Sequence, residues 1–431
     1  MKVAIIGAGW AGLAAAVKAT QTGHHVTVFE ATQVLGGRAR AITSATAQSL
    51  PDGTPLRLDN GQHILIGAYT ETLALMRLVG IQPDEVLLNL PMTLQFPDGL
   101  GLQFTAWPTP LDALGGILQA SGWSLADKWS LLRAALGWKI KGFTCAPSLS
   151  VAELCRHLTP KIQAELIDPL CISALNTPPE QASAQVFLRV LRDALFGAPG
   201  GSRLLLPKVD LSALFPDAAA SWLLGRGSLI KRGQRVESFH PQGQKWQVQG
   251  GLFDAVIVAT AASHAVQLLA PYVKQAPPDT VANVQHWIHL AQCMRHEAIA
   301  TVYAWAPQVT LPQPMLALHS TAQQPAQFVF DRGQLGGPNG LLAFVVSAAQ
   351  GERTTLQNQV LAQARAQLGL NLEPLQTVVE KRATFACTPG LQRPPAVIAP
   401  GLLACGDYVA GPYPATLEGA VLSGSAAVAL L

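Results

Sequence analysis

The start of the chain combines an apolar strand pattern with a glycine-rich turn. Residues 2–6 are mostly apolar and lead directly into Gly-x-Gly-x-x-Gly at positions 7–12, and an alanine-rich helical segment follows. A second apolar run at 25–29 ends at the acidic residue Glu30. This order of strand, turn, helix, strand and acid predicts a Rossmann-like unit that binds an adenine dinucleotide.

The three glycines have different tasks in such a unit. The first permits the tight turn, the second lets the backbone approach a pyrophosphate, and the third lets the helix pack closely on the strand. The helix N-terminus offers free N–H groups and a positive dipole end to the phosphates. An acid at the end of the second strand accepts hydrogen bonds from the ribose hydroxyls. We therefore expect cofactor contacts from Gly7, Gly9, Trp10, Ala11, Gly12 and Glu30.

A glycine pair and an arginine follow the predicted ribose-binding acid. Gly36 and Gly37 leave the backbone free to approach a ligand, and Arg38 carries a planar guanidinium that suits phosphate oxygens. The alternative interpretation is a surface loop with a solvated arginine. Because the segment comes directly after the ribose acid, we expect all three residues to contact the cofactor.

A second indication of the cofactor lies near the end of the chain. Residues 401–405 predict a short buried strand that ends at Gly406 and Asp407, and Thr416 and Leu417 open an apolar helix. An aspartate at a strand end can hold a ribityl hydroxyl, and a helix N-terminus can face a flavin ring where negative charge develops. A simple NAD-binding unit has no use for such an element. These features favour FAD over NAD, and we expect it to be bound non-covalently.

These residues resemble the superfamily of FAD-dependent amine oxidases, phytoene desaturases and protoporphyrinogen oxidases. Within it, the chain is most similar to the hydroxysqualene dehydroxylases of bacterial hopanoid synthesis, over essentially its whole length. Three segments support the narrower resemblance, at 58–69, 170–179 and 406–420. The resemblance also implies that Gly61, Gln62 and Val236 contact FAD.

The fold that this resemblance implies is α/β. A Rossmann-like FAD-binding domain of the glutathione reductase and amine oxidase type is interleaved with a substrate domain that mixes sheet and helices. We expect the FAD-binding domain to comprise residues 1–75, 203–270 and 375–431. We expect the substrate domain to comprise residues 76–202 and 271–374.

Local patterns predict the elements of these domains. Helical patterns dominate a lobe at about 111–195, and a further helix is expected near 352–367. Short runs rich in β-branched and aromatic residues predict strands at 228–230, 234–239, 245–249, 253–258, 300–305 and 341–346.

Composition limits the partners of the chain. Charged residues make up 13% of it, below the roughly 25% of an ordinary soluble domain. This composition suits a long apolar substrate, although no apolar run approaches the roughly 18 residues that a membrane-spanning helix needs. The net charge of +3 is small and dispersed, so we expect no nucleic-acid partner. The six cysteines form no CxxC pair, so we expect no metal site and a reducing, cytoplasmic compartment.

The segment 111–143 has a different character. Its basic residues outnumber its acidic ones, and its apolar residues recur at helical spacing around Trp123, Trp129 and Trp138. Basic amphipathic helices with tryptophan suit the interface of a bilayer, which predicts peripheral contact with the inner face of the cytoplasmic membrane. The alternative is an ordinary helical lobe whose tryptophans lie in the core.

Candidate residues for the chemistry are few. The resemblance places His63 beside the flavin, where it could act as a catalytic polar group, although a structural histidine is an equal alternative. Tyr413 is a second catalytic candidate. Cys171, Asn176 and Tyr408 are expected to line the substrate cavity.

The resemblance implies a reaction with a long apolar isoprenoid. Hydroxysqualene would lose its allylic hydroxyl as water, and reduced FAD would deliver hydride to give squalene. Alternatives are a phytoene-type carotenoid desaturase, an amine or porphyrinogen oxidase, and a non-catalytic flavin-binding partner of squalene-synthase-like proteins. Turnover of the flavin by substrate would separate the enzymes from the last of these.

Overall fold

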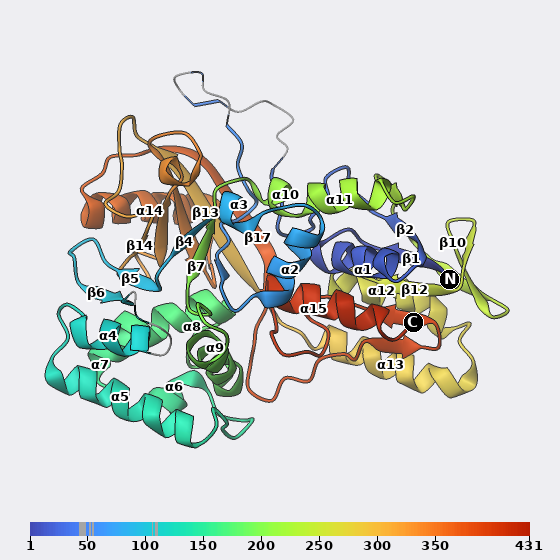
Figure 1. Cartoon of the computed structure of the whole chain (residues 1–431), viewed down its shortest axis with the longest axis horizontal. Coiled ribbons are helices and arrows are strands. Elements are labelled where there is room, and N and C mark those ends of the chain that lie inside the picture. Colours follow the sequence, from blue (N-terminus) through green and yellow to red (C-terminus); the bar gives the residue numbers. More distant parts are fainter. Residues whose placement is uncertain (43–48, 51–52, 54–55, 106, 108–110) are drawn as a thin grey trace.

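Strands from both ends and the middle of the chain form one sheet in a computed structural model, which describes residues 1–42, 49–50, 53, 56–105, 107 and 111–431 (Figure 1). This six-stranded sheet has the order β18-β19-β12-β1-β2-β8. Its neighbouring strands are parallel except for β18, which is antiparallel to β19. The central β12 is buried along its whole length, as expected for a parallel strand covered on both faces. The strands are β1 (Lys2–Ile6), β2 (His25–Phe29), β8 (Leu229–Lys231), β12 (Ala255–Val258), β18 (Val397–Ala399) and β19 (Leu402–Ala404).

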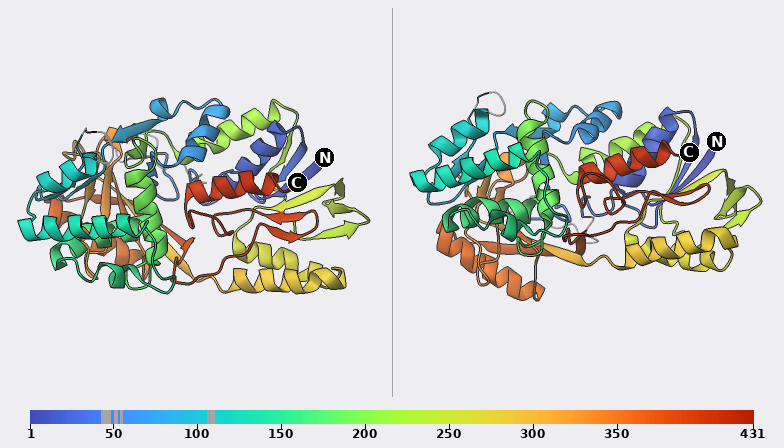
Figure 2. Two further views of the ribbon diagram at one scale, coloured as in Figure 1. Left: turned by 60° about the horizontal axis from the view of Figure 1, so that its bottom comes forward. Right: turned by 90° about the horizontal axis from the view of Figure 1, so that it is seen from below.

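Helices cover both faces of this sheet (Figure 2). On one face α1 packs against α15 and α11, and on the other lie α12 and α13. A small antiparallel sheet in the order β11-β10-β9 adjoins them. The elements are α1 (Trp10–Gln21), α10 (Leu211–Leu214), α11 (Pro216–Leu224), α12 (Ala262–Val273), α13 (Pro278–Gln292), α15 (Leu417–Val428), β9 (Phe239–Gln242), β10 (Lys245–Val248) and β11 (Gly251–Phe253).

The contact between α1 and α15 is unusually close. A Cβ atom at Gly424 of α15 would lie 2.4 Å from the carbonyl oxygen of Ala11 and 2.9 Å from the backbone nitrogen of Ala15, both in α1. Real Cβ atoms do not approach backbone atoms this closely, so the two helices can meet only where α15 has no side chain.

A second, antiparallel sheet forms the other half of the molecule. Its order is β14-β15-β16-β13-β17, and α14 packs against β13 and β17 on one face. The buried residues Leu356, Val360 and Ala364 of α14 form a core with that face. The elements are β13 (His296–Trp305), β14 (Met315–Ala317), β15 (Phe328–Asp331), a 3-10 turn (Gly333–Leu335), β16 (Leu341–Ser347), α14 (Arg353–Leu368) and β17 (Glu373–Phe385).

A helical lobe and two small sheets complete the fold. No helix within the described ranges is both long and apolar enough to cross a bilayer. The lobe comprises α4 (Leu111–Gln119), α5 (Leu125–Ile140), α6 (Val151–Cys155), α7 (Pro160–Ile162), a π-helical turn (Gln163–Ile167), α8 (Asp168–Leu175) and α9 (Ala184–Phe196). The remaining elements are β3 (Leu65–Ile66), α2 (Thr70–Leu78), α3 (Pro83–Val86), β4 (Leu87–Leu90), β5 (Thr93–Gln95), β6 (Gly101–Gln103) and β7 (Leu204–Pro207).

The predicted α/β class and its Rossmann-like sheet are confirmed, but some local expectations are wrong. Residues 234–238 are not a strand, because the backbone N–H of Gln234 donates to the carbonyl of Glu30 instead of entering a ladder. The strand expected at 253–258 is interrupted at Asp254. Two elements cross the expected domain limits: α13 packs on β18 of the parallel sheet, and β17 passes residue 375 within the antiparallel sheet.

Candidate active site

One large cavity extends from the glycine turn to the helical lobe. Its volume is about 1190 Å³. That exceeds the roughly 300–1,000 Å³ usual for a single ligand site, so it can hold two ligands side by side. The antiparallel sheet forms one wall with mostly apolar side chains, including Ile299, Met315, Phe328, Phe330 and Val345.

The glycine turn after β1 forms the nucleotide end of the cavity. Gly7 has a φ of +111°, and a Cβ atom there would lie 2.7 Å from the carbonyl oxygen of Ala259. A Cβ atom at Gly12 would lie 2.0 Å from the carbonyl oxygen of Gly7, which explains the need for glycine where the helix meets the turn. Gly9 is the N-cap of α1 and offers no side chain to its first N–H groups. These groups can therefore bind an anion in the cavity, which Gly9, Trp10 and Ala11 line.

Glu30 is held beside this turn by backbone donors. One carboxylate oxygen accepts a 2.9 Å hydrogen bond from the N–H of Ala8, and the other accepts two 2.9 Å bonds from the N–H and hydroxyl of Thr32. A carboxylate has about four lone pairs, so acceptor capacity remains for a sugar. Glu30 and Val236 both line the cavity, as expected for an adenosine site.

Arg38 and Asp407 form an ion pair at the cavity wall. Arg38 also donates a 2.7 Å hydrogen bond to the carbonyl of Ala383, at the end of β17. Although burial opposes the charge, Asp407 and Glu380 raise the pKa of the Arg38 guanidinium. The sequence predicted that Arg38 contacts a phosphate and that Asp407 contacts a ribityl hydroxyl. In the structure these two side chains pair with each other. Gly36, Gly37 and Gly406 line the same stretch of wall.

The N-terminus of α15 also reaches the cavity. Thr416 caps the helix by accepting a 2.9 Å hydrogen bond from the N–H of Gly419, and Thr416 and Leu417 line the cavity. The neighbouring Glu418 is buried and accepts hydrogen bonds from the N–H groups of Glu71 and Thr72. It therefore caps α2, and burial raises the pKa of its carboxyl group.

Gly61, Gln62 and His63 also line the cavity. The Nδ1 atom of His63 lies 3.2 Å from the carbonyl oxygen of Gly61. Burial lowers the pKa of His63, so its imidazole is neutral at neutral pH. The side-chain oxygen of Gln62 accepts a 3.3 Å hydrogen bond from Arg332.

Asp59, in the same segment, is buried behind the cavity wall. Its carboxylate accepts a 2.9 Å hydrogen bond from the N–H of Leu211, and burial raises its pKa to about 6. An unfolded aspartate has a pKa of about 3.9. The folded state therefore holds the proton more tightly, and this stabilisation is complete below about pH 4 and lost as the pH rises through about 6.

We expect the substitution Asp59→Asn to remove this pH dependence. As the pH rises from about 4 to about 7, the unfolding free energy of the unchanged protein should fall by about 2 kcal/mol relative to that of the variant. Urea unfolding at a series of pH values measures the difference. An effect of the amide that does not depend on pH shifts the unfolding free energy equally at every pH. A difference in unfolding free energy between the two proteins that stays constant with pH would therefore contradict the expectation.

Two tyrosines close the wall near the C-terminal segment. The hydroxyl of Tyr413 donates a 2.8 Å hydrogen bond to Asp193 of α9, and burial raises its pKa to about 12. Tyr408 is buried edge-on against Trp287, with ring centroids 6.2 Å apart. Its hydroxyl has no hydrogen-bond partner among the described residues. Tyr408 lines the cavity, although its hydroxyl oxygen is itself buried from solvent.

The two predicted residues of α8 differ in position. Asn176 lines the cavity and ends the helix with a φ of +46°. Its amide donates to the hydroxyl of Thr384 at 2.9 Å and accepts from the N–H of Ala348 at 2.7 Å. The expectation for Cys171 is wrong, because its thiol is fully buried and donates to the carbonyl of Thr177. Leu170 and other residues of α8 face the cavity in its place.

Sequence reasoning missed the far end of the cavity. Apolar residues of the lobe surround it, from α4, α5 and α9. The spacing of Val190, Leu191, Ala194 and Leu195 in α9 was the available indication, since these positions share one helix face. No comparable spacing in the sequence indicated Asp193, which accepts the hydrogen bond from Tyr413.

The dinucleotide turn, the held acid beside it and the cavity beyond define a flavin-dependent oxidoreductase. The sequence model of the flavin containing amine oxidoreductases matches residues 10–431. The chain belongs to this family.

Known relatives confirm the resemblance to hydroxysqualene dehydroxylases. The hydroxysqualene dehydroxylase of Rhodopseudomonas palustris is 27% identical over an alignment of 449 residues, which covers 100% of this chain and 98% of that protein. The one from Zymomonas mobilis is 27% identical over 457 residues, with 99% and 98% covered. A zeta-carotene desaturase from Synechocystis is 38% identical over 84 residues, which cover 20% of this chain and 16% of the desaturase.

A solved structure supports the fold. An oxidoreductase from Methanosarcina mazei superposes with a TM-score of 0.70 at 17% identity, over 99% of both chains. At this identity the likeness concerns the arrangement of the elements.

Proposed function

We propose that the protein binds FAD non-covalently and uses it in the reduced state to replace the allylic hydroxyl of hydroxysqualene with hydrogen, giving squalene. The observation that carries this proposal is the continuity of the cavity. Its nucleotide end and its apolar end form one space, so a flavin seated on the glycine turn borders the place where a long hydrocarbon fits. The full-length similarity to two hydroxysqualene dehydroxylases supports the same substrate.

The residues at the nucleotide end fit FAD. The uncapped N-terminus of α1 suits the pyrophosphate, and Glu30 suits the adenosine ribose. Arg38 and Asp407, which line the same cavity as an ion pair, suit a phosphate and a ribityl hydroxyl. Acid precipitation tests the mode of attachment, since non-covalent flavin stays in the supernatant and covalent flavin sediments with the protein.

The apolar end fits a substrate without charge. Burying hydrocarbon contributes about 0.8 kcal/mol per methylene, so shape and area can supply the affinity. An amine would require a cage of aromatic rings or a carboxylate free to face its cation. The carboxylate of Asp193 is already paired with Arg192 and accepts a hydrogen bond from Tyr413, so its charge is compensated, which argues against this alternative.

The reaction is balanced by one hydride and one proton, which convert the alcohol to the hydrocarbon and water. Reduced FAD supplies the hydride when it is bound. The chain must hold the carbinol carbon at the flavin, keep water away and provide the proton. His63 and Tyr413 are the candidate donors. The raised pKa of Tyr413 keeps its hydroxyl protonated at neutral pH, and that proton must leave its hydrogen bond to Asp193 to reach a substrate.

We expect photoreduced holoprotein, mixed anaerobically with hydroxysqualene, to form squalene while its flavin becomes oxidised. In heavy water the reduced flavin carries exchangeable deuterium, so the product should gain one deuterium at the former carbinol carbon. Free reduced FAD with the same alcohol is the control.

A desaturase is the second candidate, because the local similarity to a zeta-carotene desaturase covers a fifth of the chain. It would move hydride in the opposite direction, from substrate to oxidised flavin. Oxidised protein that inserts double bonds into squalene or phytoene, and has no action on the alcohol, would establish it in place of the dehydroxylase.

A further inference from the structure

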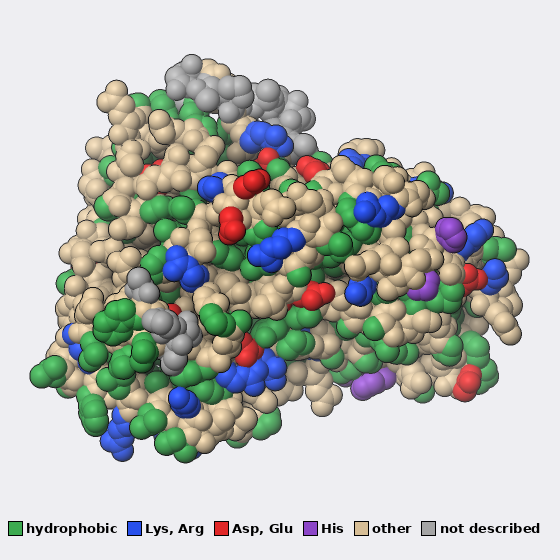
Figure 3. Space-filling view, in the orientation of Figure 1, with side chains coloured by type: hydrophobic (Ala, Val, Ile, Leu, Met, Phe, Trp, Pro, Cys, Tyr) green, Lys and Arg blue, Asp and Glu red, His purple; other side chains and the backbone are tan. Residues whose placement is uncertain are grey.

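An apolar surface lies on the outside of the helical lobe, over α4 and α5. We call it the docking surface. Hydrophobic side chains gather over these helices in the space-filling view, at its lower left (Figure 3). The exposed fractions run from 37% to 87% for Leu111, Leu114, Leu118, Leu125, Trp129, Leu136 and Ile140.

The helical spacing places these side chains on common faces. Leu125, Trp129, Leu136 and Ile140 follow one side of α5, because they lie four, seven and four residues apart. The opposite side of α5 packs into the core through residues such as Trp138. A helix that is apolar on both sides is normally covered on both sides, and here one of them is bare.

The docking surface borders one opening of the cavity, which we call the mouth. Leu111, Leu114 and Leu136 are exposed to solvent and also line the cavity. A residue with both properties lies at the rim of an opening. Phe196 at the end of α9, exposed by 37%, shares both properties. One opening of the cavity therefore lies within the apolar surface.

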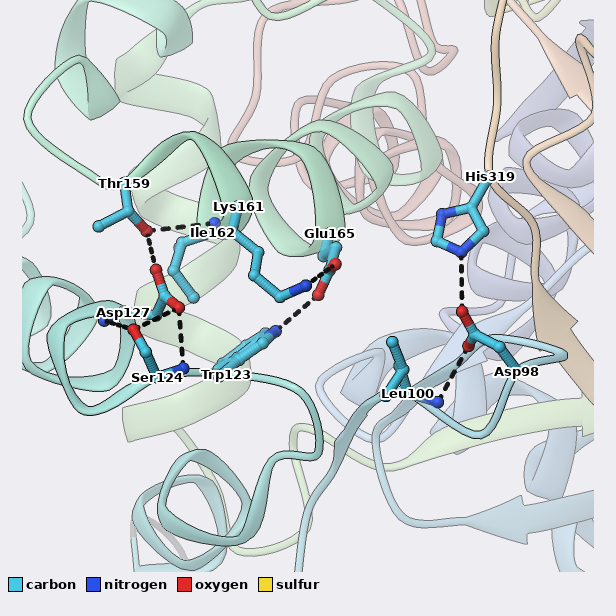
Figure 4. A network of polar contacts seen from close by, with 10 residues as sticks. All are labelled: Asp98, Leu100, Trp123, Ser124, Asp127, Thr159, Lys161, Ile162, Glu165 and His319. Carbon is cyan, nitrogen blue, oxygen red and sulfur yellow. Dashed lines mark hydrogen bonds and ion pairs between the residues drawn. The ribbon is translucent and has the colours of Figure 1, made fainter.

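The charges around this surface are positive. Lys139 and Lys128 flank one edge of the α5 stripe and Arg133 flanks the other, as the helical spacing places them. The acids of the segment face inward. Asp127 is buried, where its carboxylate accepts hydrogen bonds from Ser124 and Thr159 (Figure 4). Asp112 is also buried.

The tryptophans divide between the core and the surface. Trp123 is buried and its indole donates a 2.8 Å hydrogen bond to Glu165 (Figure 4). Trp138 is buried as well, whereas Trp129 is 69% exposed. The lobe is thus an ordinary core on its inner side, and of the three rings only Trp129 belongs to the docking surface.

We propose that the docking surface inserts into the headgroup and upper acyl region of a bilayer that contains anionic lipid. The bare apolar face would meet acyl chains, the cationic edges would meet the headgroups, and the mouth would open toward the hydrocarbon. A long apolar molecule then passes from the bilayer into the cavity without crossing water. The proposal that the protein docks on a bilayer depends only on the docking surface. The proposal that substrate passes from the bilayer into the cavity also rests on the function proposed above.

Sedimentation of the holoprotein with vesicles tests docking directly. The triple variant Leu125→Ser, Trp129→Ser, Ile140→Ser should lose at least about tenfold in partition to phosphatidylglycerol-containing vesicles, because three exposed anchors lose their burial in lipid. None of the three residues lines the cavity. A control variant, Leu224→Ser, Leu252→Ser, Val397→Ser, removes three apolar side chains that are 44% to 53% exposed in the other half of the molecule, and it should bind like the unchanged protein.

The charges are tested separately. Arg133→Gln with Lys128→Gln should weaken binding about tenfold at low salt, and phosphatidylcholine vesicles should retain less of the unchanged protein. Equal retention of the triple variant and the control overturns the proposal. So does a dimer in solution that the triple variant disrupts while vesicle binding stays the same, since the surface would then join two copies of the chain.

The passage of substrate has its own measurement. With hydroxysqualene embedded in vesicles the triple variant should turn over more slowly than the control, and with detergent-dispersed alcohol the two should match. Equal rates from vesicles overturn the passage. If no form acts on the alcohol, the proposed reaction fails, and sedimentation still decides whether the surface docks.

Discussion

Replacing Gly424 with alanine should destabilise the protein by about 3 kcal/mol and lower its affinity for flavin, because a single methyl group cannot be placed between α15 and α1 without moving backbone. The added Cβ would lie 2.4 Å from the carbonyl oxygen of Ala11. Both helices present their N-terminal residues to the cavity, so separating them moves its wall. Thermal unfolding and flavin fluorescence titration measure the two effects.

A second glycine provides the matched control. Gly137 lies within α5, and a Cβ atom there would meet no other atom within 4 Å. Gly137→Ala should therefore stabilise the protein by about 0.5–1 kcal/mol, the difference in helix propensity between the two residues. If both substitutions change the unfolding free energy in the same direction, close contact between the helices is not the reason for glycine at 424.

Glu30→Ala should lower the affinity for FAD tenfold to a hundredfold or more. Each hydrogen bond from a ribose hydroxyl to the carboxylate is worth roughly 1.5–3 kcal/mol, and the alanine side chain offers no acceptor. Titration of the apoprotein, followed by quenching of flavin fluorescence, gives the two affinities.

Two further variants separate the role of Glu30 from charge and folding. Glu237→Ala removes an exposed carboxylate from the same wall and should change the affinity little. Glu30→Gln keeps one acceptor oxygen and should fall between the alanine variant and the unchanged protein. Because Ala8 and Thr32 also lose a partner, the melting temperature of each apoprotein must be measured alongside. An unchanged affinity in Glu30→Ala would contradict the ribose role.

The nucleotide half of the fold could be predicted because its determinants are local. Strand, turn, helix, strand and acid follow one another within a short stretch, and each residue type has a backbone reason for its position. The strands β12 and β19 were also predictable, since buried parallel strands are short runs of apolar residues. The segment 234–238 was not, because its partner, Glu30, lies far away in the sequence.

The remaining site depended on contacts between distant segments. Nothing in the local pattern of Arg38 indicates that Asp407 will be its partner. Glu418 lay in a segment expected to face the flavin, yet it caps α2 through Glu71 and Thr72. The wrong expectation for Cys171 has a similar origin, since one step along a helix turns a side chain from the cavity to the core.

The end of β17 joins both regions of the cavity. The carbonyl of Ala383 accepts a hydrogen bond from Arg38, and the hydroxyl of Thr384 accepts one from Asn176 of the helical lobe. Both strand residues line the cavity. A ligand in either region that shifts this strand end therefore changes the free energy of binding in the other, and thermodynamic linkage makes the two effects equal. Binding of the cofactor would then raise or lower the affinity for the hydrocarbon, and binding of the hydrocarbon would change the affinity for the cofactor by the same factor.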